Sequence, residues 1–345
     1  MSLYKKSYKE KVIAKDKPHR LMKSLSLIFS IFIYALLSTR SGFSVSIIQQ
    51  VEEKGPFSPW FTGPLLAPAG SVVPSDHFNV QPYYFHTTVS GEYGRNWHYQ
   101  SIDKIYTNVF QVVAQIPVVP KVGFAISPQI IWNTMHGHTS FGFGDLPMML
   151  AFQLIPASQE TWKPALKLGL GVIAPVGKFD NLDPNRYNTD GTGLGSWFPN
   201  ASLVSASTIQ LGQSIHFLSI RLATAYIIGT SAHVKKNNTY GGDLTTDGWV
   251  YPGNLFKVDI SLECNLSQKW ALAMDTLYIH NNKTRFSGKT KASMRIPSGE
   301  QFSIAPALEY NFNNNIGLIG GAWITLGGRN AAQFISGVIS INVYH

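Results

Sequence analysis

The stretch that decides the fold is Phe256-Lys257-Val258-Asp259-Ile260-Ser261-Leu262-Glu263-Cys264-Asn265-Leu266, in which apolar and polar residues alternate without a break. This period of two places the apolar residues on one face of a β-strand and the polar residues on the other. Its eleven residues are also about the length with which a tilted strand crosses a bilayer. Charges at three of the five inward positions favour a strand between lipid and a wet lumen over one in a soluble core.

Similar alternating segments recur through the chain and predict twelve strands. They cover residues 77–90, 104–116, 122–134, 143–155, 164–175, 198–210, 214–230, 253–266, 270–281, 300–312, 316–327 and 332–345. Short turns follow the even-numbered strands, whereas longer polar loops, such as 178–197 and 231–251, follow odd-numbered ones. This alternation, with an even number of strands, is typical of outer-membrane barrels whose short turns are periplasmic. We therefore predict an all-β fold, a transmembrane up-and-down antiparallel barrel of about 12 strands.

A soluble β-sandwich would alternate in the same way and is the rival fold. The composition favours the barrel, because charged residues make up only 14% of the chain and aromatic residues 12%, which suits a surface that meets lipid. The single cysteine, Cys264, excludes an intramolecular disulfide and stands at an apolar position of the quoted strand. We interpret it as structural, since a thiol facing hydrocarbon has no neighbouring base or cation to lower its pKa.

The short turns also predict the register between strands. A three-residue turn at 267–269 pairs Leu266 with Trp270 and therefore Ser261 with Asp275, and it keeps the apolar residues of both strands on the outer face. The turn at 313–315 preserves the outer face in the same way. Asp259 and Glu263 then become diagonal neighbours of Asp275 on one inner wall.

Residues 1–46 are predicted to form an N-terminal extension and a signal peptide. They carry nine Lys or Arg and two acids, which is +7 of the formal net charge of +9. The apolar run 25–37 has 13 residues, which is too short for a helical span and fits the apolar region of a signal peptide. Met22 resembles a natural start, and cleavage is expected near Ile47, with Ser38 as the alternative. Because the basic charge lies in a segment that export would remove, we expect no nucleic-acid partner.

Residues 47–76 are predicted to be a proline-rich lead-in to the barrel, which itself covers 77–345. Prolines prevent regular strand pairing here, and they stand at Pro56, Pro59, Pro64, Pro68 and Pro74. Two placements stay open for this segment. It is either a periplasmic lead-in or a segment that enters the mouth of the barrel.

Three further stretches carry a family resemblance. They are Phe141-Gly142-Phe143-Gly144-Asp145-Leu146, then 164–177 with the sequence PALKLGLGVIAPVG, and 302–312 with the sequence FSIAPALEYNF. Together they resemble the outer-membrane family named for the meta-pathway of phenol degradation, over roughly residues 76–345. The resemblance implies a Gram-negative outer-membrane protein linked to uptake of apolar or aromatic compounds, similar in spirit to the fatty-acid transporter barrels.

Few residues suggest catalysis or metal binding. His136 and His138 have metal-like spacing but no third ligand close in the sequence, so we interpret them as solvated loop histidines. The loop residues Asp180, Asp183, Asn185 and Asp190 are rich in oxygen but lack the spacing of a calcium loop; weak divalent binding there is the alternative. No Gly-x-Ser-x-Gly motif stands before a helix. We therefore expect no cofactor, no metal site and no enzyme activity, with a barrel hydrolase as the remote alternative.

A set of polar residues is predicted to face the lumen. Its members are Gln111, Gln115, Gln129, Lys167, Arg221, Lys257, Asp259, Glu263, Asp275 and Glu309. Two interpretations stay open. Either the cations neutralise the acids within a wet lumen, or the acids form a selective lining that favours cations.

The sequence thus predicts an exported outer-membrane barrel that acts as a passive, porin-like channel or transporter for small solutes. Its partners would be membrane lipid and a small molecule. The rival from another class is a surface or structural barrel whose long loops bind a host or neighbouring protein without transport.

Overall fold

The computed structural model describes residues 60–157, 163–211, 216–292, 294 and 296–345. The predicted N-terminal extension and signal peptide, the predicted cleavage sites and the first part of the lead-in lie outside the described residues. Within the described part of the chain, no helix has the length and apolar character needed to span a bilayer. One short 3₁₀ helix, η2 (Pro184–Arg186), occurs in a loop.

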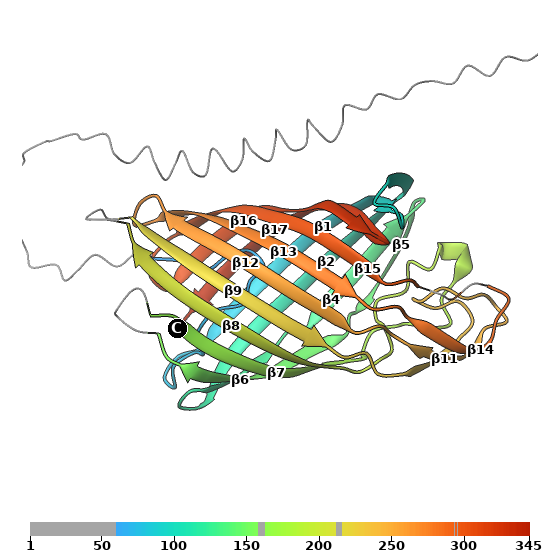
Figure 1. Cartoon of the computed structure of the whole chain (residues 1–345), viewed down its shortest axis with the longest axis horizontal. Helices are drawn as coiled ribbons and strands as arrows, with labels where there is room; N and C mark the ends of the chain where they lie inside the picture. Colours follow the sequence, from blue (N-terminus) through green and yellow to red (C-terminus); the bar gives the residue numbers. More distant parts are fainter. Residues whose placement is uncertain (1–59, 158–162, 212–215, 293, 295) are drawn as a thin grey trace, which may run out of the picture. The chain divides into compact units, whose positions relative to one another are not determined.

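Twelve antiparallel strands close into a barrel (Figure 1), as the sequence predicts. Ten of them are continuous: β1 (Asn79–Tyr93), β2 (Tyr99–Val119), β7 (Ala165–Ala174), β8 (Phe198–Gln210), β9 (Phe217–Ile227), β12 (Leu255–Asn265), β13 (Trp270–Asn281), β15 (Gly299–Asn311), β16 (Ile316–Arg329) and β17 (Ala331–Tyr344). Each pairs with its neighbours along the chain, and β1 pairs with both β2 and β17. That last pairing closes the sheet on itself and leaves no open edge.

The other two wall strands are each interrupted once. The third consists of β3 (Val122–Ile126) and β4 (Gln129–Met135), and the fourth of β5 (His138–Phe143) and β6 (Leu146–Ile155). The first break falls at Pro128, which has no N–H to donate to a ladder. Hydrogen bonds nevertheless continue across it, since Ser127 N donates to Pro147 O at 2.9 Å.

The predicted register across the short turns is confirmed. Ser261 pairs with Asp275, and Leu266 N donates to Trp270 O at 2.8 Å across the 267–269 turn. Along β12 the two faces differ as expected: Ile260 is 49% exposed, whereas Asp259 is fully buried. Lipid-facing and lumen-facing positions therefore alternate along this strand.

Aromatic side chains pair across strands near both ends of the wall. Close to the short turns, the rings of Trp270 and Tyr310 pack in a tilted arrangement with 4.7 Å between their centroids. Towards the long loops, the ring centroids of Tyr278 and Phe302 lie 4.8 Å apart. Trp270 and Tyr278 stand eight positions apart on β13, which is ~26 Å along the tilted strand. Aromatic girdles on either side of an apolar band of roughly 25 Å are the mark of a membrane barrel.

The long loops carry a folded unit where the sequence predicts only loops. Three short strands, β10 (Ala232–Lys235), β11 (Asp247–Tyr251) and β14 (Arg285–Lys289), form a separate sheet beyond the end of the wall (Figure 1). They cover a small core of Val234, Tyr240, Val250 and Met294, with Phe179 and Phe286 packed against it. Burial raises the pKa of Tyr240 to about 12, so its phenol stays neutral.

Candidate functional site

The described part of the lead-in enters the barrel, where residues 60–72 contact the wall. Leu65, only 1% exposed, packs in one cluster with inward residues of the wall, among them Ala273, Ala305 and Ile319. Of the two placements that the sequence leaves open, the structure therefore shows the one in which this segment enters the barrel. The prolines explain why it lies there as an irregular chain and adds no strand.

Polar side chains of the wall bind the lead-in through its backbone N–H groups. Glu309 Oε2 accepts from Thr62 N at 2.8 Å, and the Asp275 carboxylate accepts from Leu66 N at 3.2 Å and Ala67 N at 3.1 Å. Because no strand pairs with this segment, its buried N–H groups need such partners. Two of the predicted lumen acids, Glu309 and Asp275, thus bind backbone N–H groups of the lead-in.

Wall side chains also donate to the carbonyls of the lead-in. Asn311 Nδ2 donates to Trp60 O at 3.1 Å, and the Lys167 ammonium donates to Ala69 O. Gln153 does both, since its Oε1 accepts from Val72 N at 2.7 Å while its Nε2 donates to Gly70 O at 3.4 Å. The segment is therefore held along its length by both kinds of contact.

The acidic wall is covered and has nearby cations. Arg221 Nη2 lies 2.8 Å from Glu263 Oε2, and Lys257 Nζ lies 3.7 Å from Asp259 Oδ2. Asp259, Glu263, Asp275 and Glu309 are all 0% exposed. The sequence-based expectation of a wet lumen at this wall is wrong, because the lead-in occupies that space.

Three cavities flank the lead-in. The first, of ≈ 330 Å³, lies between residues 68–73 of the lead-in and the wall from β2 to β12. The second and third have volumes of ≈ 230 Å³ and ≈ 300 Å³. The first two share Pro68, Val113 and Gln115, and the last two share Ala69 and Arg221. The lead-in therefore does not fill the lumen. It leaves these three neighbouring cavities between itself and the wall.

The predicted lumen residues fall into three groups. Gln111, Gln115, Lys167, Arg221 and Lys257 line one or more of these cavities. The four acids lie outside the linings of all three, under the lead-in or beside a cation. Gln129 donates from Nε2 to Asp145 O at 2.7 Å and so bridges the interruption between β5 and β6.

The first cavity is mostly apolar. Its walls include Val72, Val113, Phe124, Met149 and Ile173. Its polar groups are few and stand apart, among them Gln115, Lys167 and Lys257. Pockets that hold small apolar ligands have this composition and a volume of roughly 300–1,000 Å³.

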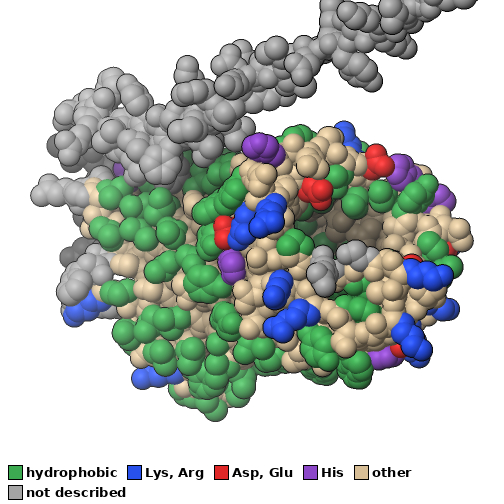
Figure 2. All heavy atoms as spheres, turned by 45° about the vertical axis from the view of Figure 1, so that its right-hand side comes forward, with side chains coloured by type: hydrophobic (Ala, Val, Ile, Leu, Met, Phe, Trp, Pro, Cys, Tyr) green, Lys and Arg blue, Asp and Glu red, His purple; other side chains and the backbone are tan. Residues whose placement is uncertain are grey.

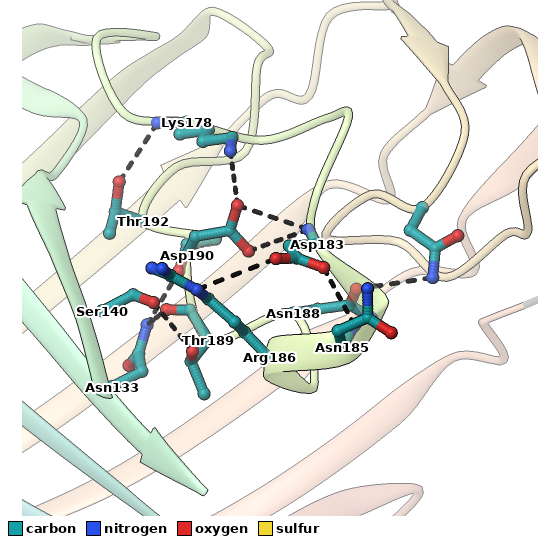
Figure 3. A network of polar contacts seen from close by, with 12 residues as sticks. Asn133, Ser140, Lys178, Asp183, Asn185, Arg186, Asn188, Thr189, Asp190 and Thr192 are labelled. Atoms are coloured by element: carbon teal, nitrogen blue, oxygen red, sulfur yellow. Dashed lines mark hydrogen bonds and ion pairs between the residues drawn. The ribbon is translucent and has the colours of Figure 1, made fainter. Parts of the chain in front are cut away.

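At the other end of the lumen, the loop between β7 and β8 folds back onto the inner wall (Figure 3). Asn133 Nδ2 of β4 donates to Thr189 O at 3.1 Å and Gly191 O at 2.8 Å, and Ser140 of β5 bonds Thr189. The loop thereby narrows the barrel mouth on the side of the long loops.

The acids of this loop are engaged by the protein's own donors. The Lys178 ammonium pairs with Asp190, and Asp183 Oδ1 caps Asn185 N at 2.9 Å (Figure 3). Asp180 Oδ2 accepts from Lys235 N at 3.2 Å. No group of three or more His, Cys, Asp or Glu among the described residues is placed to hold a metal, His136 and His138 included. His136 instead lies 3.1 Å from Asp103.

Gln153 and Asn311 hold the lead-in but do not appear in the predicted set. Parity alone could have found them, since each is a polar residue between two apolar or aromatic ones, in Phe152-Gln153-Leu154 and Tyr310-Asn311-Phe312. The contacts themselves could not be found this way, because the residues that form them are 81 to 251 positions apart in the sequence.

Comparison with solved structures places this architecture among membrane barrels. The barrel resembles an outer membrane channel from Pseudomonas putida F1, with a TM-score of 0.61 and 13% sequence identity over 81% of this chain and 100% of that one. This likeness shows the fold. The transport unit of the autotransporter AIDA-I from Escherichia coli has a TM-score of 0.45 at 13% identity, over 78% of this chain and 90% of that one. The TodX monoaromatic hydrocarbon channel has a TM-score of 0.37 at 10% identity, over 81% and 90%. These two scores are too low to support an argument.

No protein-family model matches the chain, and no curated protein matches it in sequence.

Proposed function

We propose that this protein is a passive channel of a bacterial outer membrane for small apolar solutes, including aromatic ones. The barrel fold, the exposed apolar wall and the two aromatic bands support the location. The long loops would then be extracellular and the short turns periplasmic. No catalytic turnover or cofactor is part of the proposal.

The observation that carries the solute class is the apolar cavity between the lead-in and the wall. A charged solute would lose its hydration there without enough polar groups to replace it, whereas an apolar solute would gain by leaving water. The resemblance of residues 141–146, 164–177 and 302–312 to the phenol meta-pathway family points to the same solutes. That family membership is part of the proposal, as is the division into an N-terminal extension and signal peptide at 1–46, a proline-rich lead-in at 47–76 and a barrel at 77–345.

Met149→Trp tests the solute class. Met149 lines the cavity, so a larger side chain should fill it and reduce uptake of benzene-like solutes into reconstituted liposomes by at least tenfold. The matched control is Leu150→Trp, because Leu150 is the next residue of β6 and faces outward, 42% exposed. Uptake by the control should equal that of the parent.

The same measurement separates the rival function. A parent protein that folds into liposomes and passes neither apolar nor charged solutes would favour a surface or structural barrel. Equal loss in both variants would show that the cavity is not the path.

A further inference from the structure

The small sheet of β10, β11 and β14 has two unlike faces. Val234 and Val250 point into the core beneath it and are fully buried. Trp249 and Tyr251, which alternate with Val250 along β11, are 48% and 47% exposed. The sheet therefore presents a second face to its surroundings with two large aromatic side chains on it.

Positive charge is concentrated around this sheet. Of the 19 Lys and Arg that follow residue 46, seven lie in segments 231–251 and 282–297, which hold only two acids. Six of the seven belong to the described residues and all are exposed: Lys235, Lys236, Lys283, Arg285, Lys289 and Lys291. Figure 2, with the loop end turned forward, shows more blue than red side chains there.

The register places three of these cations on the aromatic face. Lys235 of β10 and Lys289 of β14 both pair with Asp247 of β11, and Arg285 pairs with Tyr251. Side chains of directly paired residues project to the same side of a sheet. We call this surface the basic aromatic face, formed by Lys235, Trp249, Tyr251, Arg285 and Lys289.

The one acid on this face is already occupied. Asp247 Oδ1 lies 3.0 Å from His233 Nε2, and the His233 ring packs edge-on against Trp249 at 5.2 Å. Lys235, Arg285 and Lys289 form no ion pair with any residue that the structure describes. Their charges are available to an external anion.

The sheet that carries the basic aromatic face is joined by short links to the long-loop ends of β12 and β13. Three residues join β11 to β12, and three join β13 to β14. At that end of the wall, the paired residues Tyr226 of β9 and Phe256 of β12 are exposed on the lipid side. Trp, Tyr, Lys and Arg are the side chains that favour the level of lipid headgroups.

We propose that the basic aromatic face binds the phosphate groups of anionic glycolipids in the outer leaflet. Lys235 and Lys289 flank β11 at about 10 Å between their backbones, with Arg285 roughly 13 Å further down β14. Ammonium and guanidinium groups form strong charge-assisted hydrogen bonds to phosphate. The proposal rests on the outer-membrane location proposed above, but it is independent of what the lumen passes.

The test measures binding of bisphosphorylated lipid A to the full-length mature protein in neutral detergent, by native mass spectrometry, with a chelator present to exclude bridging metal ions. Lys235→Gln with Lys289→Gln should weaken binding ~30-fold, since each surface cation contributes roughly a factor of five. Lys121→Gln with Lys269→Gln removes the same charge from two exposed residues of the short turns and should leave binding unchanged. Asp247→Asn should strengthen it.

Three further measurements complete the test. Lipid A without its phosphates should bind the parent no better than the double variant binds intact lipid A, and added salt should weaken parent binding. Inorganic phosphate at equal concentration should not compete. Equal effects of the two double variants, or no preference for phosphorylated lipid, would overturn the proposal. Apolar uptake by Lys235→Gln with Lys289→Gln should stay at the parent level, which separates this proposal from that of the channel.

Discussion

At the scale of single residues, Asp275 has the clearest role. Its two carboxylate oxygens accept hydrogen bonds from consecutive N–H groups of the lead-in, at 3.2 and 3.1 Å. An intramolecular hydrogen bond contributes ~0.5–1.5 kcal/mol to stability, and Asp275 accepts two of them from the lead-in. One side chain on β13 therefore holds the middle of the lead-in against the wall.

Asp275→Ala should release that part of the lead-in and raise single-channel conductance severalfold. The matched control is Asp259→Ala on the neighbouring strand, because Asp259 receives no hydrogen bond from the described part of the lead-in and has Lys257 as its ion-pair partner. Planar-bilayer recordings of both variants supply the measurement. A conductance that rises equally in both would assign the effect to loss of charge and not to release of the lead-in.

At the scale of elements, the lead-in depends on close approach to the wall. A Cβ atom added to Gly70 would stand 2.2 Å from Ala206 Cβ on β8, which is closer than any real contact. Gly70 thus lets the chain lie flat beside β8 at the point where Gln153 Nε2 donates to its carbonyl. The lead-in fits the lumen through its backbone as much as through its side chains.

Gly70→Val should push the lead-in off the wall without unfolding the barrel. We expect faster solute uptake in liposomes and earlier proteolysis of the lead-in, with strand content unchanged by circular dichroism. Gly337→Val is the control, since a Cβ there would meet no atom within 4 Å. Lead-in cleavage at the parent rate in Gly70→Val would contradict the tight fit.

The elements also show which features the sequence could predict. The wall strand β13 matches its predicted limits, 270–281, because apolar residues recur at alternate positions along most of its length. The limits of β8 also match the predicted 198–210, although this strand alternates poorly. The register follows from the parity of short turns. By contrast, β10 and β11 have four and five residues, and polar loop signals surround them. Strands of this length contain too few alternating apolar and polar residues to be distinguished from a loop by sequence.

The lumen was harder to predict for a different reason. Alternation correctly places Asp275 and Glu309 on the inner face, but a period of two cannot say whether water or protein lies opposite. Thr62 and Glu309 are 247 residues apart in the chain, and proline-rich segments carry no pattern that names a partner. The sequence therefore predicts that these acids line a pore. In the structure, they accept hydrogen bonds from the lead-in instead.

At the scale of the whole molecule, orientation is set by the two unlike ends. Leu244 in the long-loop end is 68% exposed, and Lys269 lies in the short turn between β12 and β13. The single native cysteine, Cys264, is buried and should contribute little background labelling.

Leu244→Cys on intact cells should react with a membrane-impermeant maleimide, whereas Lys269→Cys should react only after the outer membrane is permeabilised. Protection follows from the periplasmic placement of short turns. As the control, both variants should be labelled in permeabilised cells, which shows that both introduced thiols are reactive. Labelling of position 269 in intact cells would reverse the proposed orientation.

The pairing of β1 with β17, which closes the barrel, also bears on the order in which the strands pair during folding. Asn79 pairs with Tyr344, so the first and last wall strands meet across almost the whole barrel sequence. Such a distant pairing carries a large loop-closure entropy and forms late in folding. The lead-in directly precedes β1, and its partners Asp275 and Glu309 stand on β13 and β15. Binding of the lead-in to β13 and β15 would bring β1 closer to β17 and so lower the entropy cost of their pairing. We therefore expect the segment that narrows the finished lumen also to assist closure of the barrel during folding.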